Sequence, residues 1–207
     1  MIRRDALLLG LSAALATSLP ALALDRALTP QEQQLIADIG TYNSAIRTMV
    51  GRYLQIDTNG GRTEGTFFLE RPDKVAFRYA PPSREEIVSV GRGFYVLNRR
   101  DETYYAYPQD TIPLRQFLGD KINLLDANVL DVTTADGYIT ITVVDETVAG
   151  TVQVSLIFDT DSKDLVQWSL VEPSGAELTF SLYDVEKDVQ IPPAFFSIPA
   201  TFTPLEQ

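Results

Sequence analysis

Paired carboxylates are the main candidates for chemistry in this chain, because its 207 residues include no histidine and no cysteine. The absence of both residue types excludes Ser-His and Cys-His nucleophile systems and the common zinc sites. The adjacent acids Glu85-Glu86 and Asp145-Glu146 are the nearest thing to an acid–base pair. Neighbouring residues of a strand point to opposite faces, so neither pair converges on one substrate. We therefore predict a protein that is not an enzyme, with no catalytic residues and no cofactor.

A weak similarity to a calcium-binding loop occurs in the segment Asp159-Thr160-Asp161-Ser162-Lys163-Asp164, which has three carboxylates. It lacks the turn glycine and the distal glutamate of such loops, and Lys163 stands among the would-be ligands. A polar hairpin loop explains this composition better. The sequence therefore predicts no metal site.

One arginine has a more informative setting. Residues 65–82 form two alternating segments that meet at Arg71-Pro72, with large apolar residues on one face of each. At the end of its strand, Arg71 could extend over a cavity mouth and donate to backbone carbonyls of a covering loop or helix. We predict that it acts as a latch on such a cover. The alternative is a solvated arginine at a corner of the chain.

The N-terminus is typical of an export signal. Arg3 and Arg4 precede an apolar stretch over residues 6–19, and Ala21-Leu22-Ala23 is a small-residue cleavage site. We expect residues 1–23 to be a signal peptide and residues 24–207 to be one domain; an N-terminal anchor helix is the alternative. The formal net charge of −11 argues against nucleic acid and against docking on anionic lipid. It favours a cationic partner surface, or serves solubility alone.

The elements that must position these groups are one helix and many short strands. Thr29-Pro30-Gln31-Glu32 is a helix start with a capping box, and apolar residues follow at helical spacing as far as Met49. Short helical segments are also expected from Thr111 through Phe117-Leu118 and over 121–125. Elsewhere the period is two, which predicts one large antiparallel sheet of about 11 strands. The strands are expected at 50–57, 62–70, 75–79, 86–90, 94–98, 103–107, 129–134, 138–144, 151–158, 165–172 and 176–185, with an edge strand near 195–198.

So many strands should curl, and a few helices cannot fill the concave face of so wide a sheet. We therefore predict an α+β fold with a hydrophobic cavity between the sheet and its helices. Ordinary core packing is the alternative for each wall residue. The candidate wall residues are Leu35, Ile36, Ile39, Phe67, Leu69, Val75, Phe77, Tyr79, Tyr95 and Leu97.

These residues also resemble a known family. The pattern Gly65-x-Phe67-x-Leu69-x-Arg71-Pro72, followed by Val75-x-Phe77-x-Tyr79 and Pro82, is similar to that of the periplasmic outer-membrane lipoprotein carriers, the LolA family. Further matches come in the same order: Ile87-Val88-Ser89-Val90-Gly91 precedes the 94–98 strand, and Thr111-Ile112-Pro113-Leu114 precedes Phe117-Leu118. Val90 stands where many members carry an Asp, and the segment after Phe196 is short.

The resemblance implies an open half-barrel with a helical lid over a hydrophobic cavity, held closed by Arg71, with Phe77 as an aromatic wall position. It also implies a location in the periplasm. Family members receive acylated lipoproteins from an inner-membrane ABC transporter and pass them to an outer-membrane receptor or membrane. We expect a monomer that carries lipoprotein acyl chains in this way. The alternatives are a periplasmic module that senses lipids or lipoproteins, and a carrier of another lipid.

Overall fold

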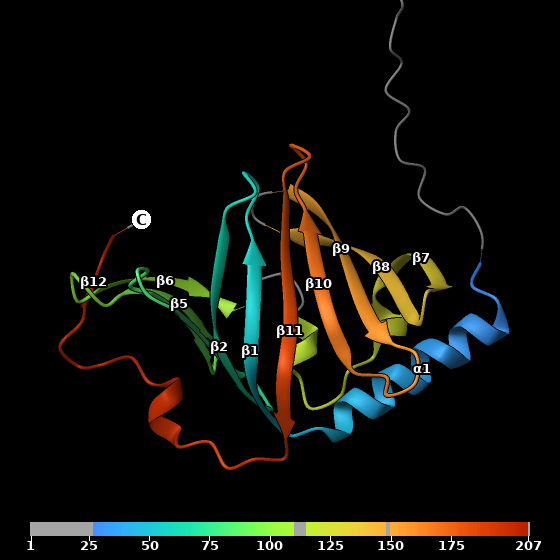
Figure 1. Ribbon diagram of the computed structural model, residues 1–207, viewed down its shortest axis with the longest axis horizontal. Coiled ribbons are helices and arrows are strands. Elements are labelled where there is room, and N and C mark those ends of the chain that lie inside the picture. Colours follow the sequence, from blue (N-terminus) through green and yellow to red (C-terminus); the bar gives the residue numbers. More distant parts are fainter. Residues whose placement is uncertain (1–26, 110–114, 148–149, 207) are drawn as a thin grey trace, which may run out of the picture.

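The computed structural model describes residues 27–109, 115–147 and 150–206. The expected signal peptide at 1–23 and the helix start at Thr111 lie outside these ranges. The described strands form a single open sheet of twelve strands, in the order β12-β6-β5-β4-β3-β2-β1-β11-β10-β9-β8-β7 (Figure 1). Neighbouring strands are antiparallel except β12 and β6, which are parallel. The strands are β1 Thr48–Ile56, β2 Arg62–Glu70, β3 Lys74–Tyr79, β4 Glu85–Val90, β5 Gly93–Asn98, β6 Thr103–Pro108, β7 Asn128–Ala135, β8 Tyr138–Thr147, β9 Gly150–Asp159, β10 Leu165–Val171, β11 Glu177–Lys187 and β12 Thr203–Pro204.

This order confirms the predicted large antiparallel sheet and shows how it is assembled. Strands β1 to β6 are consecutive neighbours, and so are β7 to β11. The two meanders join where β1 pairs with β11, so strands near both ends of the chain lie at the centre of the sheet. The described part of the segment between the meanders, residues 115–127, contains two short 3₁₀ helices, η2 Arg115–Leu118 and η3 Leu124–Asp126.

The helix α1 Pro30–Ala45 begins as predicted. The Thr29 hydroxyl accepts from the backbone N–H of Glu32, whose carboxylate accepts from the backbone N–H of Thr29. The helix ends earlier than the apolar spacing indicated. Met49 already belongs to β1, where it pairs with both β2 and β11. Residues 46–50 have helical apolar spacing but are rich in β-branched side chains, which favour a strand. Hydrogen bonding to a strand on each side stabilises the extended conformation there.

The two faces of the sheet are covered by different parts of the chain. On the inner face, defined by Tyr53 and Phe158, the cover is α1, η2 and η3. On the outer face, defined by Ala76 and Val88, the cover is the C-terminal segment. Figure 1 shows α1 beside β7 to β10, and the C-terminal segment beside the other half of the sheet. Within the described ranges, no helix has the length and apolarity needed to cross a membrane.

The C-terminal segment differs from the prediction. An edge strand near residues 195–198 was expected, but the chain forms the 3₁₀ helix η4 Pro193–Phe196 there. The apolar side chains of η4 pack on the outer face beside Leu97. This burial stabilises the segment more than strand pairing at the edge of the sheet would. The edge of the sheet is extended instead by β12, which pairs with β6.

Candidate functional site

The inner face of the sheet carries a cross-strand row of apolar side chains. Phe67 on β2 lies opposite Phe77 on β3, and Phe77 lies opposite Ile87 on β4. The row continues through Val96 on β5 to Tyr105 on β6. Directly opposed residues of antiparallel strands share a face. These five side chains therefore form one apolar row across five strands.

A second row runs beside the first. Leu69 lies opposite Val75, Val75 opposite Ser89, Ser89 opposite Phe94, and Phe94 opposite Tyr107. Four of these five residues are apolar or aromatic. Apart from Ser89, these two rows are therefore apolar across all five strands, β2 to β6.

The cover over these rows decreases from β2 towards β6. Phe67 is only 2% exposed, whereas Tyr105 is 40% and Tyr107 is 36% exposed. The residues between them in the first row are partly exposed. The described chain thus leaves one part of an apolar face incompletely covered. We call this part the open strip, and define it as Phe77, Ile87, Phe94, Val96, Tyr105 and Tyr107.

An aromatic cluster joins the open strip to the centre of the sheet. The ring centroid of Tyr53 lies 5.3 Å from that of Phe77, 5.6 Å from that of Tyr79 and 5.7 Å from that of Phe180. Trp168 stacks on Phe180 at 4.4 Å. Such contacts add about 0.5–1.5 kcal/mol per pair beyond burial. The apolar surface is therefore continuous from β10 to the open strip.

Two tyrosine hydroxyls lie in this cluster. The Tyr79 hydroxyl donates to Oε1 of Gln55 at 2.6 Å, and burial raises the pKa of Tyr79 to about 12. The buried Tyr53 hydroxyl has no hydrogen-bond partner among the described residues, and burial raises the pKa of Tyr53 well above its usual value. Both phenols are neutral at physiological pH, so they place no charge on the apolar face.

Gly65 allows this arrangement. It pairs with Tyr53 on one side and with Tyr79 on the other. A Cβ atom at this position would clash with the backbone oxygen of Arg78 and with the Tyr53 ring. The glycine therefore makes room for the ring on the inner face.

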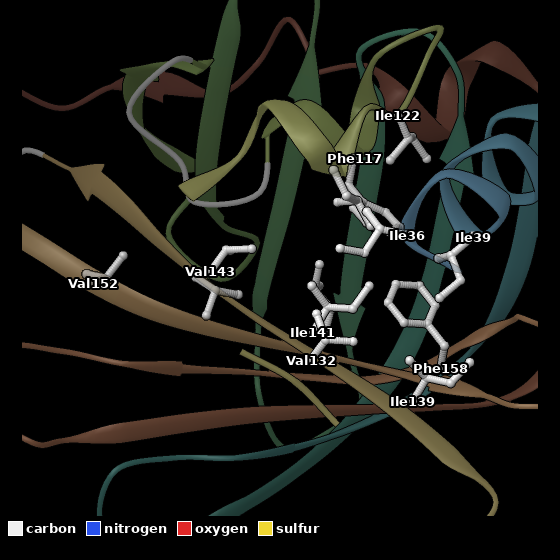
Figure 2. Close-up of a cluster of buried hydrophobic side chains, with 13 residues drawn as sticks. Ile36, Ile39, Phe117, Ile122, Val132, Ile139, Ile141, Val143, Val152 and Phe158 are labelled. Carbon is white, nitrogen blue, oxygen red and sulfur yellow. The ribbon is translucent and has the colours of Figure 1, made fainter. Parts of the chain in front are cut away.

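The other half of the inner face is filled. Ile36 and Ile39 of α1 are 0% exposed and pack in one cluster with Ile141 and Phe158. Figure 2 shows the two helix side chains pointing toward the strands that carry Ile141 and Phe158. Leu35 packs against the edge of the same cluster and is partly buried. The three predicted helix residues thus contribute to a packed core in this structure.

Arg71 connects the sheet to its inner cover. Its side chain is 4% exposed, and its Nη1 donates to the carbonyl of Ile46 at 2.7 Å, while Nε donates to the carbonyl of Phe117 at 3.2 Å. Ile46 is the C-cap residue of α1, and Phe117 belongs to η2. Burial, with a smaller contribution from nearby Arg47, lowers the pKa of Arg71 to about 10. A single charged side chain therefore joins the end of β2 to both covering elements.

The structure separates two predicted wall residues from the rest. Tyr95 and Leu97 were expected on the cavity wall, but they lie on the outer face in a cluster with Ile191 and Phe196. The inner positions of β5 are Phe94 and Val96, which the sequence reasoning missed together with Ile87. All four residues 94–97 are apolar, so alternation could not assign a face. The outer face of β5 is apolar because the C-terminal segment covers it.

The predicted hydrophobic cavity is not confirmed. A pocket of about 230 Å³ lies between the end of α1 and the strands β1, β10 and β11. It is smaller than the roughly 300–1,000 Å³ of ordinary ligand sites. It is also partly polar at its walls. The lining residues are Asn43, Met49, Asp164, Leu165, Val166, Leu182 and Val185.

One of the candidate acids, Glu86, has structural partners. Glu86 is buried on the outer face, between Arg78 at 2.9 Å and Arg99. Its neighbour Glu85 is exposed and in register with Asn98. Since adjacent strand residues point to opposite faces, the two carboxylates do not converge.

The segment that resembled a calcium loop is a hydrogen-bonded turn. The Asp159 carboxylate accepts from the backbone N–H groups of Asp161 at 3.0 Å and Ser162 at 2.8 Å, and these bonds lower the pKa of Asp159. Asp164 instead pairs with Lys187 at 2.6 Å. Across the described ranges, no three His, Cys, Asp or Glu residues are grouped so that they could hold a metal ion.

Comparison with known families gives one match. Residues 44–199 match the profile of the family described as outer membrane lipoprotein carrier protein LolA. That range contains β1 to β11, Arg71 and the open strip. No curated protein sequence matches the chain.

Solved structures share the fold at very low sequence identity. An uncharacterized conserved protein from Thermus thermophilus has a TM-score of 0.51 and 7% identity, over 84% of this chain and 98% of that one. A DUF1329 family protein from Desulfovibrio piger has a TM-score of 0.50 and 8% identity, over 80% and 97%. A putative outer membrane lipoprotein-sorting protein domain from Vibrio parahaemolyticus has a TM-score of 0.51 and 9% identity, over 81% and 97%.

Proposed function

Because the chain belongs to the LolA family of outer membrane lipoprotein carriers, we propose that it binds the acyl chains of lipoproteins on its inner face and delivers them to the outer membrane. It acts in the periplasm. The donor is an inner-membrane lipoprotein-releasing ABC transporter, and the acceptor is an outer-membrane receptor or the membrane itself. The protein takes part as a carrier and catalyses no reaction.

The observation that carries this proposal is the open strip. It offers partly exposed apolar side chains on four neighbouring strands, β3 to β6, and it continues without interruption into the buried aromatic cluster around Tyr53. A large apolar surface that is only partly covered is typical of a site for an apolar ligand. An acyl chain that lies along the strip would extend the existing core.

Entry of an acyl chain beyond the open strip, beneath the covering elements, requires the cover to move. The 230 Å³ pocket is too small for such a chain, so the segment containing η2, or α1, must shift away from the sheet. The Arg71 bonds to Ile46 and Phe117 oppose that shift. Each hydrogen bond to a charged group contributes about 1.5–3 kcal/mol.

The energy of chain burial is large enough to break such bonds. An acyl chain of about 16 carbons gains roughly 13 kcal/mol when it is buried, at about 0.8 kcal/mol per CH₂. The donor membrane buries the same chain, so exchange between membrane and carrier is close to balanced. Small differences in the free energy needed to open the cover then set the direction of transfer.

Trp168 offers a direct test, because it is the single tryptophan of the chain and stacks on Phe180 of the aromatic cluster. The mature protein is titrated with a fatty acid that carries bromine along its chain, which quenches nearby tryptophan. We expect saturable quenching, and at least about 10-fold weaker binding when Val96→Lys places a charge on the open strip. Thr133→Lys, on the exposed side of the edge strand β7, is the matched control and keeps the wild-type affinity.

A chain that shows no saturable quenching and is isolated from the periplasm without any acylated cargo would contradict the proposal. Mass spectrometry of the purified protein identifies that cargo. Bound lipid with no lipoprotein would favour a carrier of another lipid. Retained lipoprotein that is never transferred to acceptor membranes would favour a sensor.

A further inference from the structure

Three arginines surround a pocket at one end of the sheet. Arg84 lies in the connection between β3 and β4, and Arg99 and Arg100 lie in the connection between β5 and β6. Together with Pro82 they line a pocket of about 430 Å³. All four residues are exposed. This is a concentration of positive charge on a chain whose formal net charge is −11.

The arginines of this pocket are available to a ligand and partly preorganised. Among the described residues, no ion pair engages Arg84 or Arg100. Arg99 is held in place by buried Glu86, which Arg78 also holds at 2.9 Å. The carboxylate of Glu86 is thus neutralised by two guanidinium groups, and the pocket keeps an excess of positive charge.

Nearby acids do not line the pocket. The Asp101 carboxylate accepts a hydrogen bond from the side-chain amide of Asn98 at 2.7 Å. Glu85 is adjacent in sequence to Glu86 and therefore belongs to the opposite side of β4.

We propose that this arginine pocket binds the phosphate groups of anionic phospholipids and docks this end of the sheet on a membrane surface. Guanidinium groups bind phosphate oxygens through paired, charge-assisted hydrogen bonds. A protein that is acidic overall is repelled by anionic lipid, so contact with such a membrane needs a local positive site. The pocket supplies it. This revises the expectation from net charge alone, which argued against anionic lipid.

The position of the pocket suits exchange of apolar cargo. Tyr79 of the aromatic cluster is the last residue of β3 and lies only three positions before Pro82. Arg71 is at the other end of β2, which pairs antiparallel with β3. Docking through the arginine pocket therefore brings the strand ends near Tyr79 to the bilayer and leaves the Arg71 contacts away from it.

Vesicle co-sedimentation tests this inference without acylated cargo, so its outcome is separate from that of the carrier function. The full mature chain is mixed with phosphatidylglycerol vesicles or with phosphatidylcholine vesicles. We expect binding to the anionic vesicles only, weakened by added salt. The Arg84→Gln/Arg100→Gln variant should bind about 25-fold more weakly, since each arginine near an anionic surface contributes about a five-fold factor.

The Arg92→Gln/Lys121→Gln variant is the charge-matched control. It removes two exposed cations away from the pocket, and we expect it to bind as the wild type does. Equal losses in both variants, or equal binding to both kinds of vesicle, would overturn the inference. A third arm measures binding of inorganic phosphate and glycerol phosphate by calorimetry. If these small anions bind as tightly as the vesicles do, and if the Arg84→Gln/Arg100→Gln variant loses that binding, then the ligand is free phosphate and the inference of a membrane lipid is wrong.

Discussion

The two halves of the inner face differ in how completely they are covered. On β8 and β9, Ile141 and Phe158 are entirely buried beneath α1 and η2. On β5 and β6, Val96 and Tyr105 are partly exposed. Both halves are built from strands with apolar side chains directed inward, so the strands alone do not account for the difference. The covering elements do, and the candidate site is the part of the apolar face where this cover ends.

Removing one aromatic ring from each half tests the difference in cover most directly. Phe158→Ala should lower the free energy of unfolding by about 3–5 kcal/mol, because it leaves a cavity in the filled half. Phe94→Ala in the open strip should cost about 1 kcal/mol or less, since solvent already reaches that ring. Urea denaturation measures both values. Equal losses would show that the open strip is packed as tightly as the filled half.

Removing the arginine that joins the sheet to its cover tests how firmly the cover is held. Arg71→Leu leaves the Ile46 and Phe117 carbonyls unbonded. We expect a loss of about 2 kcal/mol, reduced from the full value because a buried charge is removed as well. We also expect roughly 10-fold faster hydrogen exchange in residues 115–126 and altered release of bound acyl chains.

Arg47→Gln is the control for that variant. Arg47 pairs with Asp120 at 2.7 Å, but both side chains are at least half exposed. Such pairs contribute little. If Arg47→Gln accelerates exchange in residues 115–126 as much as Arg71→Leu does, then burial of Arg71 has no special role in holding the cover.

The smallest effect concerns pH. Burial raises the pKa of Tyr79 to about 12, so the unfolded chain loses this proton before the folded chain does. The stabilisation is therefore present below pH 10 and is lost as pH rises from 10 to 12. We expect Tyr79→Phe to remove roughly 1–2 kcal/mol of this dependence, as measured by urea denaturation at a series of pH values. An unchanged slope in the variant would assign the dependence to another buried phenol, such as Tyr53.

Much of the fold could be predicted because its signals are local. The capping box at Thr29 involves groups that are three residues apart. The alternation of Phe67, Leu69, Val75 and Phe77 places these side chains on one face whatever the neighbouring strands are. The same alternation places Glu85 and Glu86 on opposite faces, and the polar composition of residues 159–164 predicted the hydrogen-bonded turn found there.

The parts that were not predicted depend on distant segments. The face occupied by Tyr95 and Leu97 is set by the C-terminal segment, which is about 100 residues away in sequence. The end of α1 is set by pairing of Met49 with two other strands. The extent of the cover over the open strip depends on packing between α1, η2 and the sheet.

Residue types and short spacings are thus enough to assign the strand periodicity, the position of the Arg71-Pro72 corner and the lack of His- or Cys-based chemistry. Long-range packing sets which part of the apolar surface is filled, which part is covered by the C-terminal segment, and which part remains partly exposed. It also decided that Arg84, Arg99 and Arg100 meet at one pocket. Burial and charge clustering are properties of the surface that two elements form together, so the sequence of neither element is enough to predict them.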